Sequence, residues 1–278
     1  MRKFFCLLAA MILLIGAEFD EEVFFRQEKT VEVPIVMYHL VTTNKRYVGK
    51  HGITPEELAA DLRWLKENDY NTVVMQDLIN FVERGKRLPK KPIMLTFDDG
   101  NRSDYEYLFP LLEELDMRAV LAIIGSATDE CSAGCAKNPT AKYPNMTWTQ
   151  IKQMHDADAA EIISHSYDLH GRRGSGRKKG ESDVAYRERL SKDLLQLQQK
   201  CEEHLGFVPV GFAYPLGVIS NGSQEILQEL GFKASLSCWE GVAVITRDEP
   251  ETLFQLKRTN RPSGKPIETI LAPFIEKQ

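Results

Sequence analysis

The sequence predicts a single α/β domain in which parallel strands alternate with helices. About seven apolar runs that suit buried strands alternate with segments that carry helix-capping residues and helical stripes. No break in composition divides the chain, and its 278 residues are enough to bury one large core. A closed barrel and an open doubly wound sheet both fit this alternation.

The predicted strands are short apolar runs, several of them rich in β-branched residues. In chain order they cover residues 33–38, 72–75, 92–97, 119–124, 161–164, 208–214 and 232–237. Parallel strands end at the same edge of a sheet, and α/β proteins bind their ligands at that edge. Polar residues at the ends of these strands are therefore the first candidates for a functional site.

The predicted helices are marked by their start and stop residues. Thr54 suits an N-cap, Pro55 the first helical position and Glu57 the partner in a capping box. Thr147 suits the N-cap of a second helix, and Gly85 and Gly206 follow two other helical stretches and suit helix ends. Besides the helix that starts at residue 55, helices are expected over residues 77–83, 103–115, 148–156, 183–205, 223–230 and 266–275.

Chemically capable side chains gather at the predicted strand ends. Asp98 and Asp99 end the third strand, His165 ends the fifth with His170 shortly after it, and His39 ends the first. Two histidines and one carboxylate are a common ligand set for a catalytic divalent metal, and the second carboxylate could act as a base. Read singly, Asp-Asp-Gly could be a plain turn, and the histidines could be surface residues.

Four segments resemble one enzyme family. Residues 96–100, Thr-Phe-Asp-Asp-Gly, resemble the first motif of the polysaccharide deacetylases (carbohydrate esterase family 4, NodB-like). Residues 165–170 resemble the second motif, with the longer spacing of the branch that deacetylates poly-N-acetylglucosamine. Residues 33–39 resemble the first strand of that branch, and residues 212–217 its short third motif. The resemblance covers residues 33–275 and implies a distorted (β/α)7 barrel.

The resemblance also implies a role for each site residue. Asp99, His165 and His170 match the metal ligands, Asp98 the catalytic base, and Leu216 the residue whose backbone N–H completes an oxyanion hole. The metal expected from the family is zinc, with cobalt, nickel or manganese as alternatives. The expected substrate is an N-acetylated polysaccharide. A plain turn at residues 214–217 is the alternative to the third motif.

The chain departs from the full motif set in its last third. It has no histidine after His204, so the general acid of the fifth motif is absent, and residues 256–261 offer cations and amides instead. The fourth-motif region keeps Trp239 but lacks an aspartate. His39 is the spare histidine at the active edge, and we expect it to replace the acid or to orient Asp98. The remaining histidines, His51, His155 and His204, are expected to be surface or structural residues.

The N-terminus predicts export. Arg2 and Lys3 precede an unbroken apolar stretch of 14 residues, 4–17, which suits a signal peptide or an uncleaved membrane anchor. Residues 18–32 would form a linker and residues 33–278 the catalytic domain. Localisation would be extracellular or in the cell envelope, with the N-terminal segment as the only membrane contact. An exported protein can also hold a disulfide, for which Cys131 and Cys135 are the candidates.

The net charge of the chain limits the kinds of partner that it is expected to bind. The net charge is −5 overall and about −7 without the first 17 residues, which argues against general nucleic-acid binding. A monomer is expected. Residues 171–180 are nevertheless basic and rich in glycine, and they form either a flexible solvated loop or a lip that contacts an anionic polymer.

Together these features predict an exported, metal-dependent hydrolase that removes N-acetyl groups from a polysaccharide containing N-acetylglucosamine. Two alternatives remain open at this stage. One is a catalytically impaired relative that binds such glycans, and the other is a membrane-anchored structural protein of the envelope.

Overall fold

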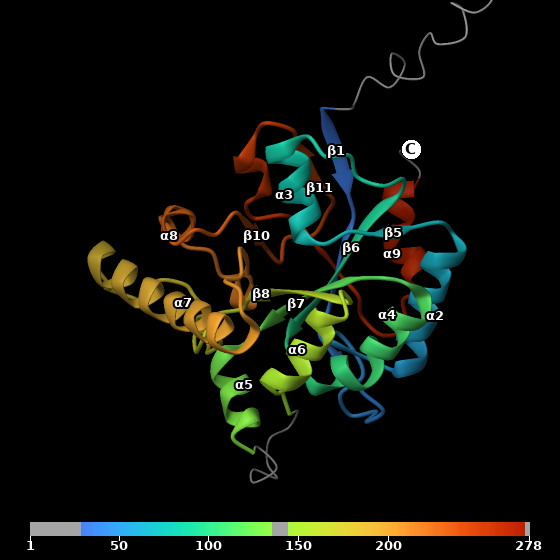
Figure 1. Ribbon diagram of the computed structural model, residues 1–278, viewed down its shortest axis with the longest axis horizontal. Coiled ribbons are helices and arrows are strands. Elements are labelled where there is room, and N and C mark those ends of the chain that lie inside the picture. The colour runs from blue at the N-terminus through green and yellow to red at the C-terminus, as the bar shows by residue number, and fades with distance from the viewer. Residues whose placement is uncertain (1–28, 135–143, 276–278) are drawn as a thin grey trace, which may run out of the picture.

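The protein was analysed as a computed structural model that describes residues 29–134 and 144–275 (Figure 1). The main sheet has parallel strands in the order β10-β9-β8-β7-β6-β2-β12. Their bounds are β2 Ile35–Tyr38, β6 Pro92–Asp99, β7 Ala119–Ile123, β8 Ala160–Ser164, β9 Gly211–Ala213, β10 Ala234–Leu236 and β12 Thr259–Asn260. One more short strand, β5 (Asn71–Thr72), pairs with the start of β6.

The sheet curls until its two edges are connected. Leu256 forms a parallel bridge to Leu236 of β10, with its N–H donating to the Ser235 carbonyl at 2.8 Å. Three residues later the chain enters β12, which pairs with β2 at the other edge. This irregular last segment makes the barrel distorted, and the predicted fold, a distorted barrel of the (β/α)7 type in a single domain, is confirmed.

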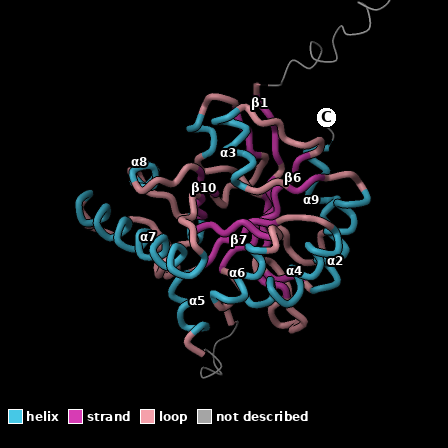
Figure 2. Tube along the Cα trace, in the orientation of Figure 1, coloured by secondary structure: helices cyan, strands magenta, loops and turns pink. Residues whose placement is uncertain are grey.

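Helices surround the curled sheet, as Figure 2 shows. Their bounds are α2 Pro55–Glu67, α3 Met75–Arg84, α4 Phe109–Leu115, α5 Gly125–Ser132, α6 Trp148–Asp156, α7 Asp183–Leu205, α8 Ser223–Glu229 and α9 Ile267–Ile275. A large apolar cluster joins α2, α4, α6 and α9 to the strands, and a separate cluster joins α7 and α8 to β9. Burial of these apolar faces is the main force that holds the helices on the sheet.

The predicted helix signals correspond to real caps. Thr54 caps α2 and forms the capping box with Glu57, and Thr147 caps α6 in the same way with Gln150. Gly206 ends α7 in the left-handed region at φ 85°. These local signals therefore located the ends of the helices to within a few residues.

Two predicted elements differ from the structure because side-chain contacts override the apolar pattern. The strand expected over residues 72–75 ends at Thr72, because the Val74 N–H bonds the Asp77 carboxylate and starts α3 at Met75. The helix expected over residues 103–115 starts with a π-helical turn, η1 (Asp104–Leu108), before α4. π-Helical turns are rare and often lie at functional sites.

A small antiparallel sheet was not predicted. β1 (Thr30–Val33) pairs with β11 (Ala243–Thr246), so the expected linker over residues 18–32 is wrong for its last three residues, which are part of the folded domain. The other short elements are β3 Leu40–Val41, β4 Gly52–Ile53, and the 3₁₀ turns η3 Pro215–Gly217 and η4 Pro250–Leu253. None of these short elements has enough residues to show a periodic pattern.

The expected signal or anchor, residues 1–17, lies outside the described residues, and so does Cys135 of the expected disulfide. Within residues 29–134 and 144–275, no helix combines the length and the apolar character needed to cross a membrane.

Candidate metal-dependent active site

One cavity of about 540 Å³ lies at the carboxyl edge of the barrel. All six residues that the sequence placed in a site line this cavity: His39, Asp98, Asp99, His165, His170 and Leu216. Residues that the sequence did not single out also line it, among them His51, Asn101 and Glu240. The barrel therefore brings together groups that are more than 170 residues apart in the chain.

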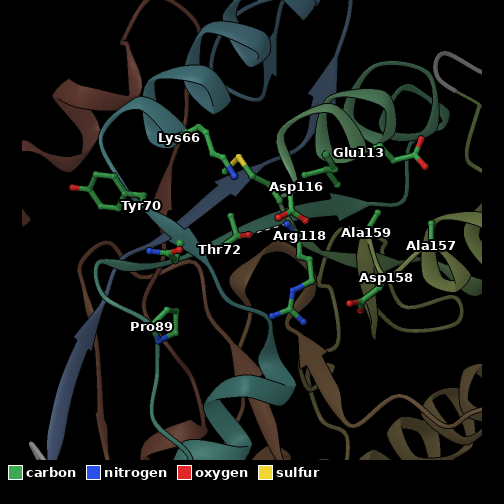
Figure 3. A pocket seen from close by; sticks show the side chains of 13 residues that line it. Lys66, Tyr70, Thr72, Pro89, Glu113, Asp116, Arg118, Ala157, Asp158 and Ala159 are labelled. Atoms are coloured by element: carbon green, nitrogen blue, oxygen red, sulfur yellow. Dashed lines mark hydrogen bonds between the residues drawn. The ribbon is translucent and has the colours of Figure 1, made fainter. Parts of the chain in front are cut away.

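A second cavity lies at the amino edge, where β5 and β7 begin (Figure 3). There the Arg118 N–H donates to Thr72 Oγ1 at 2.8 Å, and Lys66 and Asp158 line the wall. None of the six predicted site residues lines this cavity. The rule that ligands bind at the carboxyl edge of parallel strands therefore distinguishes the two cavities.

The two aspartates are placed by the end of β6. Asp98 is still in the extended strand, and its side chain is 2% exposed. Asp99 and Gly100 then turn through the left-handed region, at φ 78° and 69°. A Cβ at position 100 would lie 3.2 Å from Ile123, so a side chain there would press on β7. The strand thus ends at a left-handed turn, and both carboxylates at this end line the cavity.

The two histidines are placed by the loop after β8. Ser166 has a left-handed φ of 73°, and its Oγ accepts the Leu169 N–H at 3.0 Å. The carboxylate of Asp193, on α7, accepts the N–H groups of Tyr167 and Asp168, both at 2.8 Å. The loop between His165 and His170 is thus held from two sides, and the five-residue spacing is a compact turn rather than a helix.

Three ligand atoms converge around Asp99. Its Oδ1 lies 3.1 Å from Nε2 of His170 and 3.7 Å from Nε2 of His165, and one atom from each of the three residues fits within 4.8 Å. Asp99 Oδ1 is buried, and no hydrogen bond of ordinary geometry reaches it from the described residues. A buried carboxylate oxygen without such a bond is costly, and a cation would satisfy it.

The hydrogen bond of the other ring nitrogen of His165 also favours a cation at this place. Nδ1 of His165 lies 2.8 Å from the Ala213 carbonyl, which can only accept, so a neutral ring carries its proton on Nδ1. Burial lowers the pKa of His165 and favours the neutral ring. The charges of Asp98 and Asp99 act on this pKa in the opposite direction, but they do not outweigh burial. Its Nε2 lone pair is then free to bind a metal, in the arrangement that metal-binding histidines usually have. The residues present therefore fit a divalent metal.

Asp98 makes an ion pair that the sequence did not predict. Arg258 donates from Nη1 to Oδ1 at 2.7 Å and from Nη2 to Oδ2 at 2.9 Å. Burial alone would raise the pKa of Asp98, but the Arg258 charge, together with the imidazoles of His165 and His39, outweighs burial and holds the pKa well below its ordinary value. Asp98 is therefore ionised at neutral pH and is tied in one orientation.

His39 faces the same cavity from the end of β2. Its ring packs edge-on against His51, with the centroids 4.8 Å apart, and its buried Nδ1 has no hydrogen bond from the described residues. Burial lowers the pKa of His39, while the charges of Asp98 and Asp99 act in the opposite direction. His51 was expected to be a surface or structural residue, yet it lies on the cavity wall.

Leu216 lies on the rim, in the turn η3. Its backbone is left-handed at φ 58°, and its side chain is 52% exposed. The next residue, Gly217, has φ 65°, and a Cβ there would lie 2.7 Å from Cys238 Cβ. A glycine is thus required for the turn to reach the cavity.

Two polar groups near the site were missed by sequence reasoning. Arg258 belongs to the irregular segment before β12, and no local pattern distinguishes it from Lys257. Asp104 is fully buried on η1, and burial together with the charges of Asp99 and Asp98 raises its pKa well above the ordinary value. Its spacing to Leu108 and Leu112, four and eight residues on, was a usable signal, because a helix places all three on one face.

Comparisons with known proteins agree with this geometry. The family model described as polysaccharide deacetylase matches residues 85–235, which is more than half of the chain. The chain is 26% identical over 228 residues to a poly-beta-1,6-N-acetyl-D-glucosamine N-deacetylase of Escherichia coli, covering 75% of this chain and 34% of that protein. It is 21% identical over 208 residues to the enzyme of the same name from Staphylococcus epidermidis, covering 74% of this chain and 68% of that one.

Solved structures support the fold. A Streptococcus pyogenes deacetylase, solved in complex with acetate, superposes with a TM-score of 0.71 at 20% identity, covering 87% of this chain and 97% of that one. At this identity the likeness extends to the fold alone. The chain also spans only about a third of the length of its Escherichia coli relative.

Proposed function

The chain belongs to the polysaccharide deacetylase family, and from this premise we propose that it is a metal-dependent hydrolase that removes N-acetyl groups from a polysaccharide containing N-acetylglucosamine. The observation that carries the proposal is the convergence of Asp99, His165 and His170 on one point, beside the ionised Asp98. The names of the relatives favour a polymer of the poly-N-acetylglucosamine type.

Asp99, His165 and His170 would hold the metal. When bound, a divalent cation supplies the positive charge that polarises an acetyl carbonyl and favours ionisation of a water molecule. Zinc suits one carboxylate and two imidazoles, and cobalt, nickel and manganese are the alternatives. Asp98 is adjacent to this site but is bonded to Arg258, so we assign it a different role.

Asp98 would act as the base that accepts a proton from the attacking water. Each of its oxygens accepts one bond from Arg258, and each keeps a second lone pair. The pairing lowers the basicity of Asp98, but it also holds the carboxylate ionised and correctly aimed. Leu216 would contribute its backbone N–H to the carbonyl oxygen as negative charge develops there.

His39 would return a proton to the leaving amine. It lines the cavity together with Asp98, and the two groups interact electrostatically. Its lowered pKa leaves the ring mostly neutral, so the ring would first receive from Asp98 the proton taken from water and then pass that proton to the amine. The products are acetate and a free amine on the sugar, which balances the addition of one water molecule across the amide bond.

The setting of the enzyme is also part of the proposal. The acetamido polymer is its partner, and no nucleic acid is involved. We place the protein outside the cytoplasm, in the cell envelope or in the medium, because the apolar N-terminal stretch suits export and the polymers named for its relatives suit that location. The enzyme would work as a monomer, because the residues from each segment complete one cavity in a single chain.

Acetate release tests the proposal. Metal-free, full-length protein is incubated with oligomers of β-1,6-linked and β-1,4-linked N-acetylglucosamine, with zinc, cobalt, nickel or manganese added in turn. Acetate should appear with at least one metal, and its release should be roughly 10²–10⁴-fold slower with Asp98→Asn. Metal binding without acetate release from any polymer would instead favour a glycan-binding relative that has lost activity.

A further inference from the structure

A basic loop, residues 171–180, starts directly after His170. Together with neighbouring residues it lines a surface cavity of about 580 Å³. The charged residues of the lining are Arg172, Arg173, Lys178, Lys179, Arg189 and one acid, Asp168. The cavity is therefore strongly positive on a protein whose net charge is −5.

The backbone of the basic loop is fixed against the turn that carries Leu216. Gly174 lies so close to this turn that a Cβ there would be 2.2 Å from the Pro215 carbonyl oxygen. Ser175 is fully buried, and the Arg177 N–H donates to Ser220 Oγ at 2.9 Å. The middle of the basic loop is therefore packed on the domain, while residues 171–173 and 178–180 are exposed to solvent.

Part of the positive charge is already neutralised. Arg189 pairs with Glu181 at 2.7 Å, and Arg177 pairs with Asp183. Glu181 also accepts the backbone N–H of Lys178 at 2.8 Å. These contacts hold the loop in place. Glu181 and Asp183, the two acids just after the loop, are therefore already paired with arginines.

Lys178 is exposed and its charge acts on nearby Glu181, which leaves three cations of the lining without an acidic neighbour of this kind. Arg172, Arg173 and Lys179 are exposed, and within the described residues none of them takes part in an ion pair. The single acid of the lining, Asp168, accepts a hydrogen bond from Ser126 at 3.0 Å. The wall thus presents free guanidinium and ammonium groups in a preformed cavity.

This cavity adjoins the catalytic one. The basic loop begins at the residue after His170, and Gly174 touches the residue before Leu216, while His170 and Leu216 both line the catalytic cavity. A polymer that left the catalytic cavity on this side would pass the basic loop.

We propose that Arg172, Arg173 and Lys179 form a subsite for anionic groups on the polymer that is being deacetylated. The inference rests on the proposed function, but it directs the substrate away from a neutral poly-N-acetylglucosamine and towards an acetamido glycan that bears carboxylate or phosphate groups. Guanidinium groups bind either anion through paired hydrogen bonds. The same charges repel the amines that deacetylation creates, so the subsite also favours stretches of polymer that have not yet been processed.

Binding measured without turnover tests the subsite. Calorimetric titration of the metal-free, full-length protein compares three ligands of equal length: a neutral N-acetylglucosamine oligomer, the same oligomer with a terminal phosphate, and a glycan strand that alternates N-acetylglucosamine with N-acetylmuramic acid. At low salt at least one anionic ligand should bind roughly tenfold more tightly than the neutral one, as three surface ion pairs of ordinary strength would give. The advantage should shrink as salt is added.

The triple variant Arg172→Gln, Arg173→Gln, Lys179→Gln should lose this advantage and bind the neutral oligomer as before. The matched control is Lys86→Gln, Arg87→Gln, Lys90→Gln, which removes three exposed cations from the loop before β6. The control should keep the advantage. The ligand that shows the advantage identifies the anion as a carboxylate or a phosphate.

Equal binding of all three ligands by the unmodified protein would overturn the subsite, and so would an unchanged advantage in the triple variant. Because no turnover is required, these results are independent of acetate release. An enzyme that releases acetate but ignores charge would keep the proposed function and lose the subsite. A protein that prefers the anionic ligands but never releases acetate would keep the subsite and lose the proposed function.

Discussion

The guanidinium of Arg258 holds both carboxylate oxygens of Asp98, at 2.7 and 2.9 Å, in a region where neither side chain is more than 2% exposed. The pair joins the last segment of the barrel to the end of β6, and so connects closure of the fold to the chemistry of the site. The positive charge of Arg258 keeps Asp98 ionised, and it also makes Asp98 a weaker base. As the proposed base, Asp98 would thus be well oriented and weak, and a metal held by Asp99, His165 and His170 would have to supply the remaining catalytic power.

Removing Arg258 should destabilise the fold strongly. Arg258→Gln leaves the Asp98 charge buried without its partner, which costs about 3–5 kcal/mol in the free energy of unfolding. Urea denaturation measures this loss. The control Arg118→Gln breaks a half-exposed pair with Asp77 and should cost about 1 kcal/mol or less. Equal losses of unfolding free energy in the two variants would show that the buried pair of Arg258 and Asp98 stabilises the fold no more than a surface pair.

Asp98→Asn should separate chemistry from metal binding. The variant should keep its metal, because Asp99 and the two histidines supply the ligands, and it should lose activity by roughly 10²–10⁴-fold. Elemental analysis and acetate release measure the two properties on the same sample. If Asp98→Asn empties the site while Asp99→Asn does not, the two aspartates have the opposite roles.

His39→Gln should lower kcat more than it changes KM. A proton donor acts mainly in the transition state, whereas a residue that only shapes the cavity would alter substrate binding as well. Steady-state kinetics of acetate release distinguish these outcomes. His155→Gln is the control, because His155 packs against Phe207 outside the catalytic cavity. Full activity of His39→Gln would make His39 a structural residue.

Glu161 should make stability depend on pH. Burial raises its pKa to about 7, against an ordinary value of 4.5, although its carboxylate accepts the Gln76 N–H at the start of α3. The folded state then binds this proton more tightly than the unfolded chain does. Its contribution to stability is fully present below about pH 4.5 and is lost as pH rises through about 7, a change of roughly 2–3 kcal/mol.

Glu161→Gln should therefore be more stable relative to the unmodified protein at pH 8 than at pH 4.5. Urea denaturation across this range measures the difference, and Glu130→Gln on the exposed surface of α5 serves as the control. A difference that is constant with pH would show that Glu161 does not titrate in this interval.

The sequence predicted the parts of the site that lie at the ends of regular strands. Asp98, Asp99 and His165 each follow an apolar run, so the parallel arrangement of the strands was enough to place them at one edge. The caps at Thr54 and Thr147 were predictable for a similar reason, because capping depends on residues only a few positions apart.

The sequence could not predict contacts made by irregular segments. Arg258 meets Asp98 across 160 residues, from a stretch that has no periodic pattern. His51 enters the cavity because the short pair β3 and β4 folds its loop back toward His39, and two-residue strands have no signature in a sequence. The basic loop was visible as charge alone, and its close approach to the turn at Pro215 has no local signal in the sequence.

Metal dependence is tested by measuring metal content and acetate release together on the unmodified protein and on His170→Ala. The unmodified protein should hold about one equivalent of divalent metal and release acetate from an N-acetylglucosamine polymer. His170→Ala removes one of the three ligands and should lose most of the metal and the activity together. Unchanged metal content in His170→Ala, or equal acetate release by metal-free and metal-loaded protein, would show that Asp99, His165 and His170 do not form a catalytic metal site.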